Sequence, residues 1–245
     1  MIPYASHTNG ARNLAELRRY GWRLLRTPFT TGKTNHGFGY ALDNGAWRAH
    51  QQEIPFDESA FVDMLGKHAA GADWIVSPDI VSGGMESLAF SLSWLDRLRA
   101  YGQTILIPVQ DGMSEHDVYP HIGPRIGIFV GGSTEFKEST AAIWGRLASE
   151  CSCLMHVGRV NSARRIAICG AAGATSFDGS GASKFSVVVR GLTMAAKQAD
   201  LFAPAPEANL CPQCGQDELR PDVTRGETDC VNCGWLTKWK TRESQ

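Results

Sequence analysis

The sequence lacks an excess of charge of either sign. Its 245 residues include 24 lysines and arginines against 25 aspartates and glutamates, so the formal net charge is −1. Proteins that bind nucleic acid or anionic membranes through their overall field carry a large positive charge. The balanced composition excludes that mode of binding and names no partner.

Long apolar runs are also missing. No stretch approaches the roughly 20 apolar residues that a membrane-spanning helix needs. The first residues, MIPYASHTNGARN, do not join a basic segment to an apolar one, as a secretory signal peptide does. Because 43% of the residues are hydrophobic and 20% are charged, the chain can bury a core. We expect a globular cytoplasmic protein without a membrane partner.

Seven cysteines is an odd number, and four of them form two pairs near the C-terminal end. Cys211-Pro-Gln-Cys214 and Cys230-Val-Asn-Cys233 are 15 residues apart, and a glycine follows each pair. Two thiolates at this spacing can reach one ion, and four satisfy tetrahedral Zn²⁺. We predict a zinc ribbon in which the metal is structural and is bound by Cys211, Cys214, Cys230 and Cys233. A redox dithiol pair is the alternative.

The other cysteines are Cys151, Cys153 and Cys169. A C-x-C pair with His156 nearby could form a metal site. However, Cys153 and His156 fall in one predicted strand, where they would point to opposite faces. We therefore expect three buried structural thiols.

Short apolar runs alternate with amphipathic segments up to about residue 200, as in a parallel sheet with crossover helices. The predicted strands are 2–6, 22–27, 38–43, 74–77, 104–109, 126–130, 153–157 and 175–178. The predicted helices are 11–20, 57–70, 85–101, 137–150, 162–172 and 183–197. Eight strands in this length predict a (β/α)8 TIM-like barrel. A doubly wound sheet competes, but no G-x-G-x-x-G segment follows the first strand.

The composition and periodicity of the sequence change after residue 201. The segment FAPAPEANL has two prolines and little periodicity, which is typical of a linker. We predict a catalytic barrel over residues 1–201, a linker over 202–210 and a zinc ribbon over 211–245. The ribbon ends in a tail that interleaves tryptophans and cations between Trp235 and Arg242, a pattern suited to nucleic acid. The same pattern is equally compatible with tryptophans that pack within the ribbon and do not contact nucleic acid.

Polar residues stand beside small ones where the predicted strands end. These ends are Ser6-His7, Asp43-Asn44-Gly45, Ser77-Pro78-Asp79, Gln110-Asp111-Gly112, Gly131-Gly132-Ser133, His156-Val157-Gly158-Arg159 and Ser176-Phe177-Asp178-Gly179. Each is an ordinary turn sequence when taken alone. In a barrel, however, they meet at the catalytic end. Three carboxylates and an amide there suit a nucleophile and a general acid/base at a sugar anomeric carbon.

Five segments in fixed order carry a family resemblance. They are ALDNGAW (41–47), SPD (77–79), PVQDG (108–112), FVGGS (129–133) and HVGRVNSARRI with GATSFDGSG (156–181). The series resembles the tRNA-guanine transglycosylase superfamily over about 140 residues. It is most similar to the phage and bacterial DNA-guanine transglycosylases, which insert 7-deazaguanines into DNA. The resemblance implies a pentosyltransferase, located in the host cytoplasm if it is encoded by a phage.

The resemblance implies roles for individual residues. Asp43 would be the general acid/base and Asp178 the covalent nucleophile, which ends the last strand. Asp79 and Gln110 would recognise the edge of the base. The full set of expected substrate contacts is Asn44, Asp79, Gln110, Gly131, Gly132, His156 and Arg159. The implied partners are DNA, with its guanine flipped out or in a single strand, and a free 7-deazaguanine base similar to preQ0.

The sequence also departs from the family. The tRNA enzymes have a C-x-C-x-x-C…H zinc site and a P-T-R segment after the nucleophile, whereas Gly179-Ser180-Gly181 stands here. The chain is also shorter. A tRNA-guanine transglycosylase, a hydrolytic nucleosidase or DNA glycosylase with the same carboxylates, and a non-catalytic nucleic-acid adaptor remain as alternatives. A homodimer is compatible with the sequence. Candidate phosphate contacts are Arg159, Asn161, Arg164, Arg165 and Lys184.

Overall fold

A computed structural model of the chain describes residues 1–31, 35–202, 219–222, 227–230 and 236–238. The chain divides into two compact units, Met1–Ala203 and Pro204–Gln245. The predicted zinc ligands Cys211, Cys214 and Cys233 lie outside the described residues, as does most of the predicted linker. The zinc site therefore stays a prediction.

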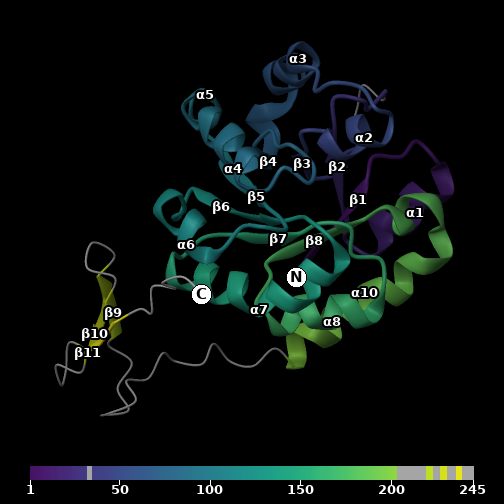
Figure 1. The fold of residues 1–245 in the computed structure, drawn as a ribbon. Coiled ribbons are helices and arrows are strands. Elements are labelled where there is room, and N and C mark those ends of the chain that lie inside the picture. The colour runs from purple at the N-terminus through teal and green to yellow at the C-terminus, as the bar shows by residue number, and fades with distance from the viewer. Residues whose placement is uncertain (32–34, 203–218, 223–226, 231–235, 239–245) are drawn as a thin grey trace. The chain divides into compact units, whose positions relative to one another are not determined.

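The first unit is a closed barrel of eight parallel strands (Figure 1). Each strand pairs with the next along the chain, and β8 pairs with β1. The strands are β1 (Ile2–Ser6), β2 (Arg23–Arg26), β3 (Tyr40–Leu42), β4 (Ala72–Val76), β5 (Thr104–Val109), β6 (Ile126–Val130), β7 (Met155–Val157) and β8 (Ser176–Gly179). The predicted TIM-like barrel is confirmed, with β1, β5 and β6 at the predicted bounds.

Helices connect most successive strands around the barrel, whereas no helix lies between β2 and β3 among the described residues (Figure 1). They are α1 (Ala11–Arg19), α2 (Ala46–Gln51), α3 (Glu58–His68), α4 (Gly84–Ser93), α5 (Leu95–Arg99), α6 (Glu115–Val118), α7 (Thr134–Glu150), α8 (Ala163–Ala171), α9 (Ser180–Lys184) and α10 (Ser186–Phe202). The helix predicted over 85–101 is interrupted at Trp94. The short helices α2, α6 and α9 were not predicted, because one turn or two carry too little periodicity.

One prediction about the cysteines is wrong. Strand β7 begins only at Met155, because Ser152 adopts a left-handed backbone (φ 51°) and the Cys153 amide bonds back to the Ala148 carbonyl. Cys153 and His156 therefore do not share a strand. Cys169 is buried as expected, whereas Cys151 and Cys153 are only half-buried.

Two layers of apolar side chains hold the barrel together. The larger cluster lies between strands and helices, where Leu24, Ile75 and Phe177 are completely buried. A second cluster of alternate strand residues fills the barrel interior: Tyr4, Leu25, Ala41, Trp74, Val76 and Leu106. This filled interior leaves the strand ends as the place for a ligand.

A polar network closes the barrel at the amino ends of its strands. The Tyr4 hydroxyl donates to Asp73 Oδ2 at 2.9 Å, and Arg23 Nη2 donates to Asp73 Oδ1 at 2.8 Å. Gly39 lies beside this ion pair, and a Cβ there would lie 2.3 Å from Arg23 Nη2, so a larger residue would force the arginine side chain to move. The network stabilises the end of the barrel opposite to the candidate site.

The second unit contains a three-stranded antiparallel sheet in the order β11-β10-β9. Its strands are β9 (Leu219–Asp222), β10 (Glu227–Cys230) and β11 (Leu236–Lys238). Cys230, one of the predicted zinc ligands, is the last residue of β10.

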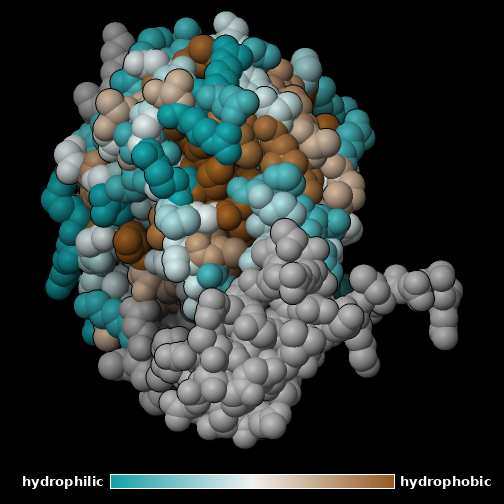
Figure 2. All heavy atoms as spheres, turned by 90° about the vertical axis from the view of Figure 1, so that its left-hand side faces the viewer, coloured by the Kyte–Doolittle hydropathy of each residue, from teal (hydrophilic) through white to brown (hydrophobic). Residues whose placement is uncertain are grey.

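On the face of the first unit that lies to the left in Figure 1, hydrophobic residues gather in the middle and hydrophilic residues surround them (Figure 2). Within the part of the chain that the structure describes, no helix is both long and apolar enough to cross a membrane.

Candidate active site at the carboxyl ends of the strands

Asp178 stands near the end of β8 and is almost fully buried. Its Oδ1 atom accepts two hydrogen bonds from β7 and the loop that follows it. His156 Nε2 lies 3.1 Å from Oδ1, and the Arg159 backbone N–H donates to the same oxygen at 3.2 Å. The carboxylate is therefore held in one orientation by two groups.

His156 lies beneath Asp178, inside the barrel, and has no exposed surface. Its Nδ1 atom is 2.8 Å from the Ser176 hydroxyl. Phe129 stacks on the imidazole with ring centroids 5.0 Å apart, and the Trp74 centroid is 4.6 Å away. Because the ring is enclosed, its polar contacts are with Asp178 and Ser176. The sequence predicts a direct substrate contact for His156, but the ring has no exposed surface with which to make one.

Asp43 follows β3 directly and accepts a hydrogen bond from the Gly45 amide at 2.7 Å. The pKa of Asp43 is raised to about 7, mainly by burial and also by the negative charges of Asp178 and Asp79, while the Gly45 hydrogen bond acts in the opposite direction. Asp43 thus lies close enough to both Asp178 and Asp79 for their charges to act on it. The structure brings together the three carboxylates that the strand ends predicted.

Asn44 positions Asp79 within this cluster. The Asn44 amide nitrogen donates to the Ser77 carbonyl and to Asp79 Oδ1, both at 2.7 Å, and Asn44 Oδ1 accepts from the Ala46 amide at 2.8 Å. Both N–H donors of Asn44 are occupied, so its role is to orient Asp79. Burial raises the pKa of Asp79 to about 6, although the Asn44 hydrogen bond opposes this.

Gln110 fastens the loop that follows Asp79. Its Oε1 accepts from the Ser82 amide at 2.7 Å, and its Nε2 donates to the Ile80 carbonyl at 2.8 Å. A primary amide has two N–H donors and two acceptor lone pairs. One of each remains, so Gln110 can position the loop and still bind a base.

Gly131 and Gly132 follow β6, and the structure gives a different reason for a glycine at each position. Gly132 has a left-handed backbone (φ 73°), and a Cβ there would lie 2.6 Å from Asp111 Oδ2. The Ser133 amide and hydroxyl also donate to Asp111, each at 2.7 Å. The backbone conformation and the contact with Asp111 therefore explain why residue 132 is a glycine. At Gly131 a Cβ would meet only the Val109 carbonyl, at an ordinary 3.4 Å, so its absence leaves open space.

Arg159 crosses the mouth of the barrel. Its left-handed backbone (φ 59°) directs its N–H to Asp178, and its guanidinium donates to the Gly132 carbonyl at 2.5 Å. The guanidinium carbon lies 4.0 Å from the centroid of the Trp47 ring, which follows β3 and is 42% exposed. Trp47 was not singled out from the sequence, although an aromatic residue four positions after Asp43 was visible in ALDNGAW.

Lys137 was also missed. It lies on the buried face of α7 with Ala141 and Trp144, and its Nζ donates to the Gly158 carbonyl at 2.9 Å. Burial lowers the pKa of Lys137 to about 8, as does the nearby Arg159 charge. The spacing of residues 137, 141, 144 and 148 could have revealed this buried lysine, because it places Lys137 in the apolar stripe of a helix.

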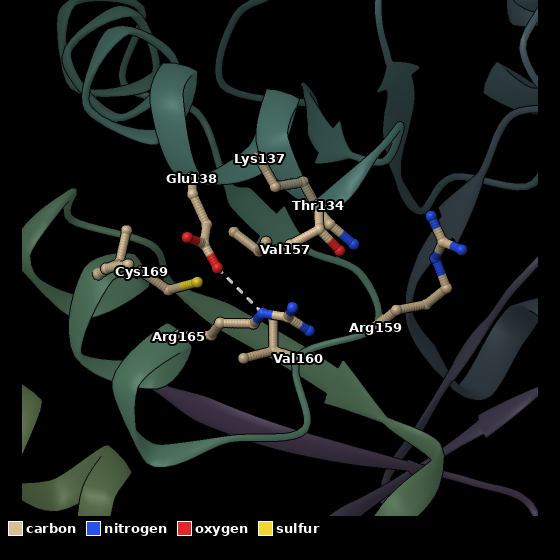
Figure 3. A pocket seen from close by; sticks show the side chains of 9 residues that line it. Thr134, Lys137, Glu138, Val157, Arg159, Val160, Arg165 and Cys169 are labelled. Atoms are coloured by element: carbon tan, nitrogen blue, oxygen red, sulfur yellow. Dashed lines mark hydrogen bonds and ion pairs between the residues drawn. The ribbon is translucent and has the colours of Figure 1, made fainter.

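A small pocket lies beside Lys137, between α7 and α8 (Figure 3). Its lining is Thr134, Lys137, Glu138, Val157, Arg159, Val160, Arg165, Ile168 and Cys169. Arg164 and Arg165 form ion pairs with Glu138 at 2.8 and 3.1 Å. The Asn161 amide oxygen accepts from the Gly181 amide at 2.8 Å. Arg164, Arg165 and Asn161, three of the candidate phosphate contacts, are thus bound to other groups of the protein.

The first unit is therefore a (β/α)8 barrel with a carboxylate cluster at the end where enzymes of this fold bind their substrates. Within the residues that the structure describes, no group of three or more His, Cys, Asp or Glu side chains could hold a metal ion. No protein-family model matches the chain, and no curated protein matches it.

Proposed function

We propose that the protein is a base-exchange glycosyltransferase that replaces guanine in DNA by a 7-deazaguanine. The observation that supports this most is the cluster of Asp43, Asp79 and Asp178. The pKa of Asp43 is raised to about 7, partly by the charge of Asp178. Two carboxyl groups in different environments can act as acid and nucleophile at the same carbon.

In the first half-reaction, an oxygen of Asp178 attacks C1′ of the deoxyribose and the bond from C1′ to guanine N9 breaks. The departing guanine takes a proton from Asp43. With a pKa of about 7, a large fraction of Asp43 carries that proton at neutral pH. The product is a covalent ester between Asp178 and the polynucleotide.

In the second half-reaction, the incoming 7-deazaguanine loses its N9 proton to Asp43 and attacks C1′. The bond from C1′ to Asp178 breaks, and its electron pair returns to the carboxylate. Two inversions give net retention. Asp43 ends protonated, ready for another cycle.

Recognition of the base is assigned to Asp79 and Gln110. A carboxylate accepts from guanine N1–H and from the exocyclic amine, and the free N–H of Gln110 suits O6. Adenine offers no N1 proton, so it leaves Asp79 without a donor and is rejected. The open space at Gly131 suits a substituent on a 7-deazapurine.

The polynucleotide must present its guanine flipped out or in a single strand, and unstacking costs a few kcal/mol. The exposed Trp47 ring offers a stacking surface for a base. In the second unit, the two C-x-x-C pairs and the three-stranded sheet fit a zinc ribbon held by Cys211, Cys214, Cys230 and Cys233. Zinc would stabilise the fold of that small unit.

The experiment is base exchange with labelled guanine. DNA and tRNA are incubated with the protein, and a 7-deazaguanine is then supplied as a chase. We expect label to enter DNA and to be chased out without abasic sites. The chase is one-way, because a 7-deazapurine has no N7 to protonate and leaves poorly. Label in tRNA alone would establish the tRNA enzyme, and abasic sites without incorporation would establish a hydrolase.

The matched control is Asp178→Ala. Wild-type protein without an incoming base should form a covalent adduct with the polynucleotide that survives denaturant, and Asp178→Ala should form none. Asp178→Glu should retain at most a trace, because the longer side chain misplaces the attacking oxygen. An adduct in Asp178→Ala would assign the nucleophile to another residue.

A further inference from the structure

The two oxygens of Asp178 have different environments. Oδ1 accepts from His156 Nε2 at 3.1 Å and from the Arg159 amide at 3.2 Å. Within the described residues no hydrogen bond is recorded to Oδ2. An oxygen whose lone pairs are occupied by two donors is a weaker nucleophile than one whose lone pairs are free. Oδ2 is therefore the better nucleophile of the pair.

His156 serves as the donor only when Nε2 carries a proton. The Ser176 hydroxyl lies 2.8 Å from Nδ1 and can donate to it. A neutral ring with its proton on Nε2 then satisfies both contacts, since Nδ1 accepts and Nε2 donates. The rings of Phe129 and Trp74 pack against the imidazole and prevent it from turning.

We infer that His156 is a positioning residue that holds Oδ1 of Asp178 through its Nε2–H and thereby assigns the attack on C1′ to Oδ2. This inference rests on the proposed function for its catalytic consequence, and on the contacts alone for the hydrogen bond. His156 does not touch the substrate, because it has no exposed surface.

The same hydrogen bond acts in both half-reactions without transferring a proton. When Oδ2 forms its bond to C1′, Oδ1 becomes the carbonyl oxygen of the ester and still accepts from Nε2–H. When the incoming base displaces the ester, the electron pair returns to the carboxylate, and the donated N–H stabilises that charge. Loss of the donor should therefore slow breakdown of the adduct through the lost charge stabilisation, and slow its formation through the lost positioning of Oδ2.

Three variants test the inference. Replacing His156 by Leu removes the donor, His156→Gln offers an N–H near the position of Nε2, and Ser176→Ala removes only the partner of Nδ1. We expect kcat to fall about 100-fold in His156→Leu, as for the loss of one preorganised donor. His156→Gln should recover at least a tenth of the wild-type kcat. KM for the free base should change less than twofold, since neither residue binds it.

A second measurement does not depend on activity. Side-chain ¹⁵N NMR of the whole protein distinguishes an Nε2–H from an Nδ1–H imidazole. We expect the Nε2–H form for His156, and a changed Nε2 resonance in Asp178→Asn. Thermal unfolding of each variant separates a folded protein with low activity from an unfolded one.

An Nδ1–H tautomer, or wild-type kcat in a folded His156→Leu, would overturn the inference. Equal loss of kcat in His156→Gln and His156→Leu, with both variants folded, would also overturn it. If the wild type exchanges no base at all, the proposed function fails. The NMR result would then still decide whether His156 donates to Asp178.

Discussion

The amine of Lys137 lies 2.9 Å from the carbonyl oxygen of Gly158, and this bond ties α7 to the loop after β7. The next residue in that loop is Arg159, whose amide donates to Asp178. Lys137 is itself buried, so the bond is protected from water. A helix on the outside of the barrel thus supports the loop that orients the proposed nucleophile.

Replacing Lys137 by Met should change how stability depends on pH. The pKa of Lys137 is lowered to about 8 by burial, whereas a lysine in the unfolded chain titrates near 10.4. The native state therefore binds fewer protons than the unfolded state between these values, and wild-type stability rises with pH across that window. In Lys137→Met the free energy of unfolding should not show this rise, which amounts to about 1–2 kcal/mol in the wild type after allowance for screening.

Urea unfolding at pH 7.5, 9 and 10 measures that difference, with Lys67→Met as the control. Lys67 is 68% exposed and forms an ion pair with the exposed Asp63. Its replacement should leave the pH dependence as in wild type. If the free energy of unfolding changes with pH in the same way in wild type and Lys137→Met, the Lys137 amine is not desolvated.

Asp43→Asn should stabilise the protein above neutral pH while it slows the reaction. The pKa of Asp43 is raised by burial to about 7, from an unfolded value near 3.9. Within that window the unfolded state has already lost a proton that the native state keeps, so stability falls as pH rises. Removing the titration should make Asp43→Asn more stable by about 1–2 kcal/mol at pH 8.

Thermal unfolding at pH 4 and pH 8 checks the sign, since the gain must be larger at pH 8. Asp63→Asn is the matched control, because Asp63 is exposed. Exchange assays on the same protein should show a fall in kcat with little change in KM for the base, as Asn cannot transfer the proton. A variant that is less stable at pH 8 would contradict the raised pKa.

The barrel and its carboxylates could be predicted because both follow from local sequence rules. Short apolar runs mark the strands, and parallel strands bring Asp43, Asp79 and Asp178 to one end. The partners of these residues could not be predicted. That Asn44 and Gln110 orient Asp79 and its loop depends on contacts between loop residues that are 35 and 30 positions apart in the sequence. Lys137 and Trp47 acquire their roles only when α7 and α2 pack against the barrel.

The zinc ribbon is tested by metal analysis. We expect one zinc ion per chain, bound by the four paired cysteines, because both pairs have the spacing of a tetrahedral thiolate site. Cys214→Ser should lose the metal and unfold the second unit, while the helical signal of the barrel persists. Cys169→Ser is the control, since Cys169 is buried in the first unit. Purified wild type without zinc would refute the assignment.

Trp47 should govern how tightly a base is held. The Arg159 guanidinium covers one face of its ring, with 4.0 Å between the guanidinium carbon and the ring centroid, and the side chain is still 42% exposed. A base can stack on the ring surface that Arg159 leaves uncovered, and stacking on an aromatic side chain contributes about 1–3 kcal/mol per base. Trp47→Ala should therefore raise KM for the free base about tenfold or more, with a smaller effect on kcat.

Trp47→Phe keeps an aromatic face, and its KM should remain within about threefold of the wild-type value. Steady-state exchange at several base concentrations measures both constants. An unchanged KM in Trp47→Ala would mean that the Trp47 ring serves only to anchor Arg159, in which case kcat should fall instead through the loop that holds Asp178.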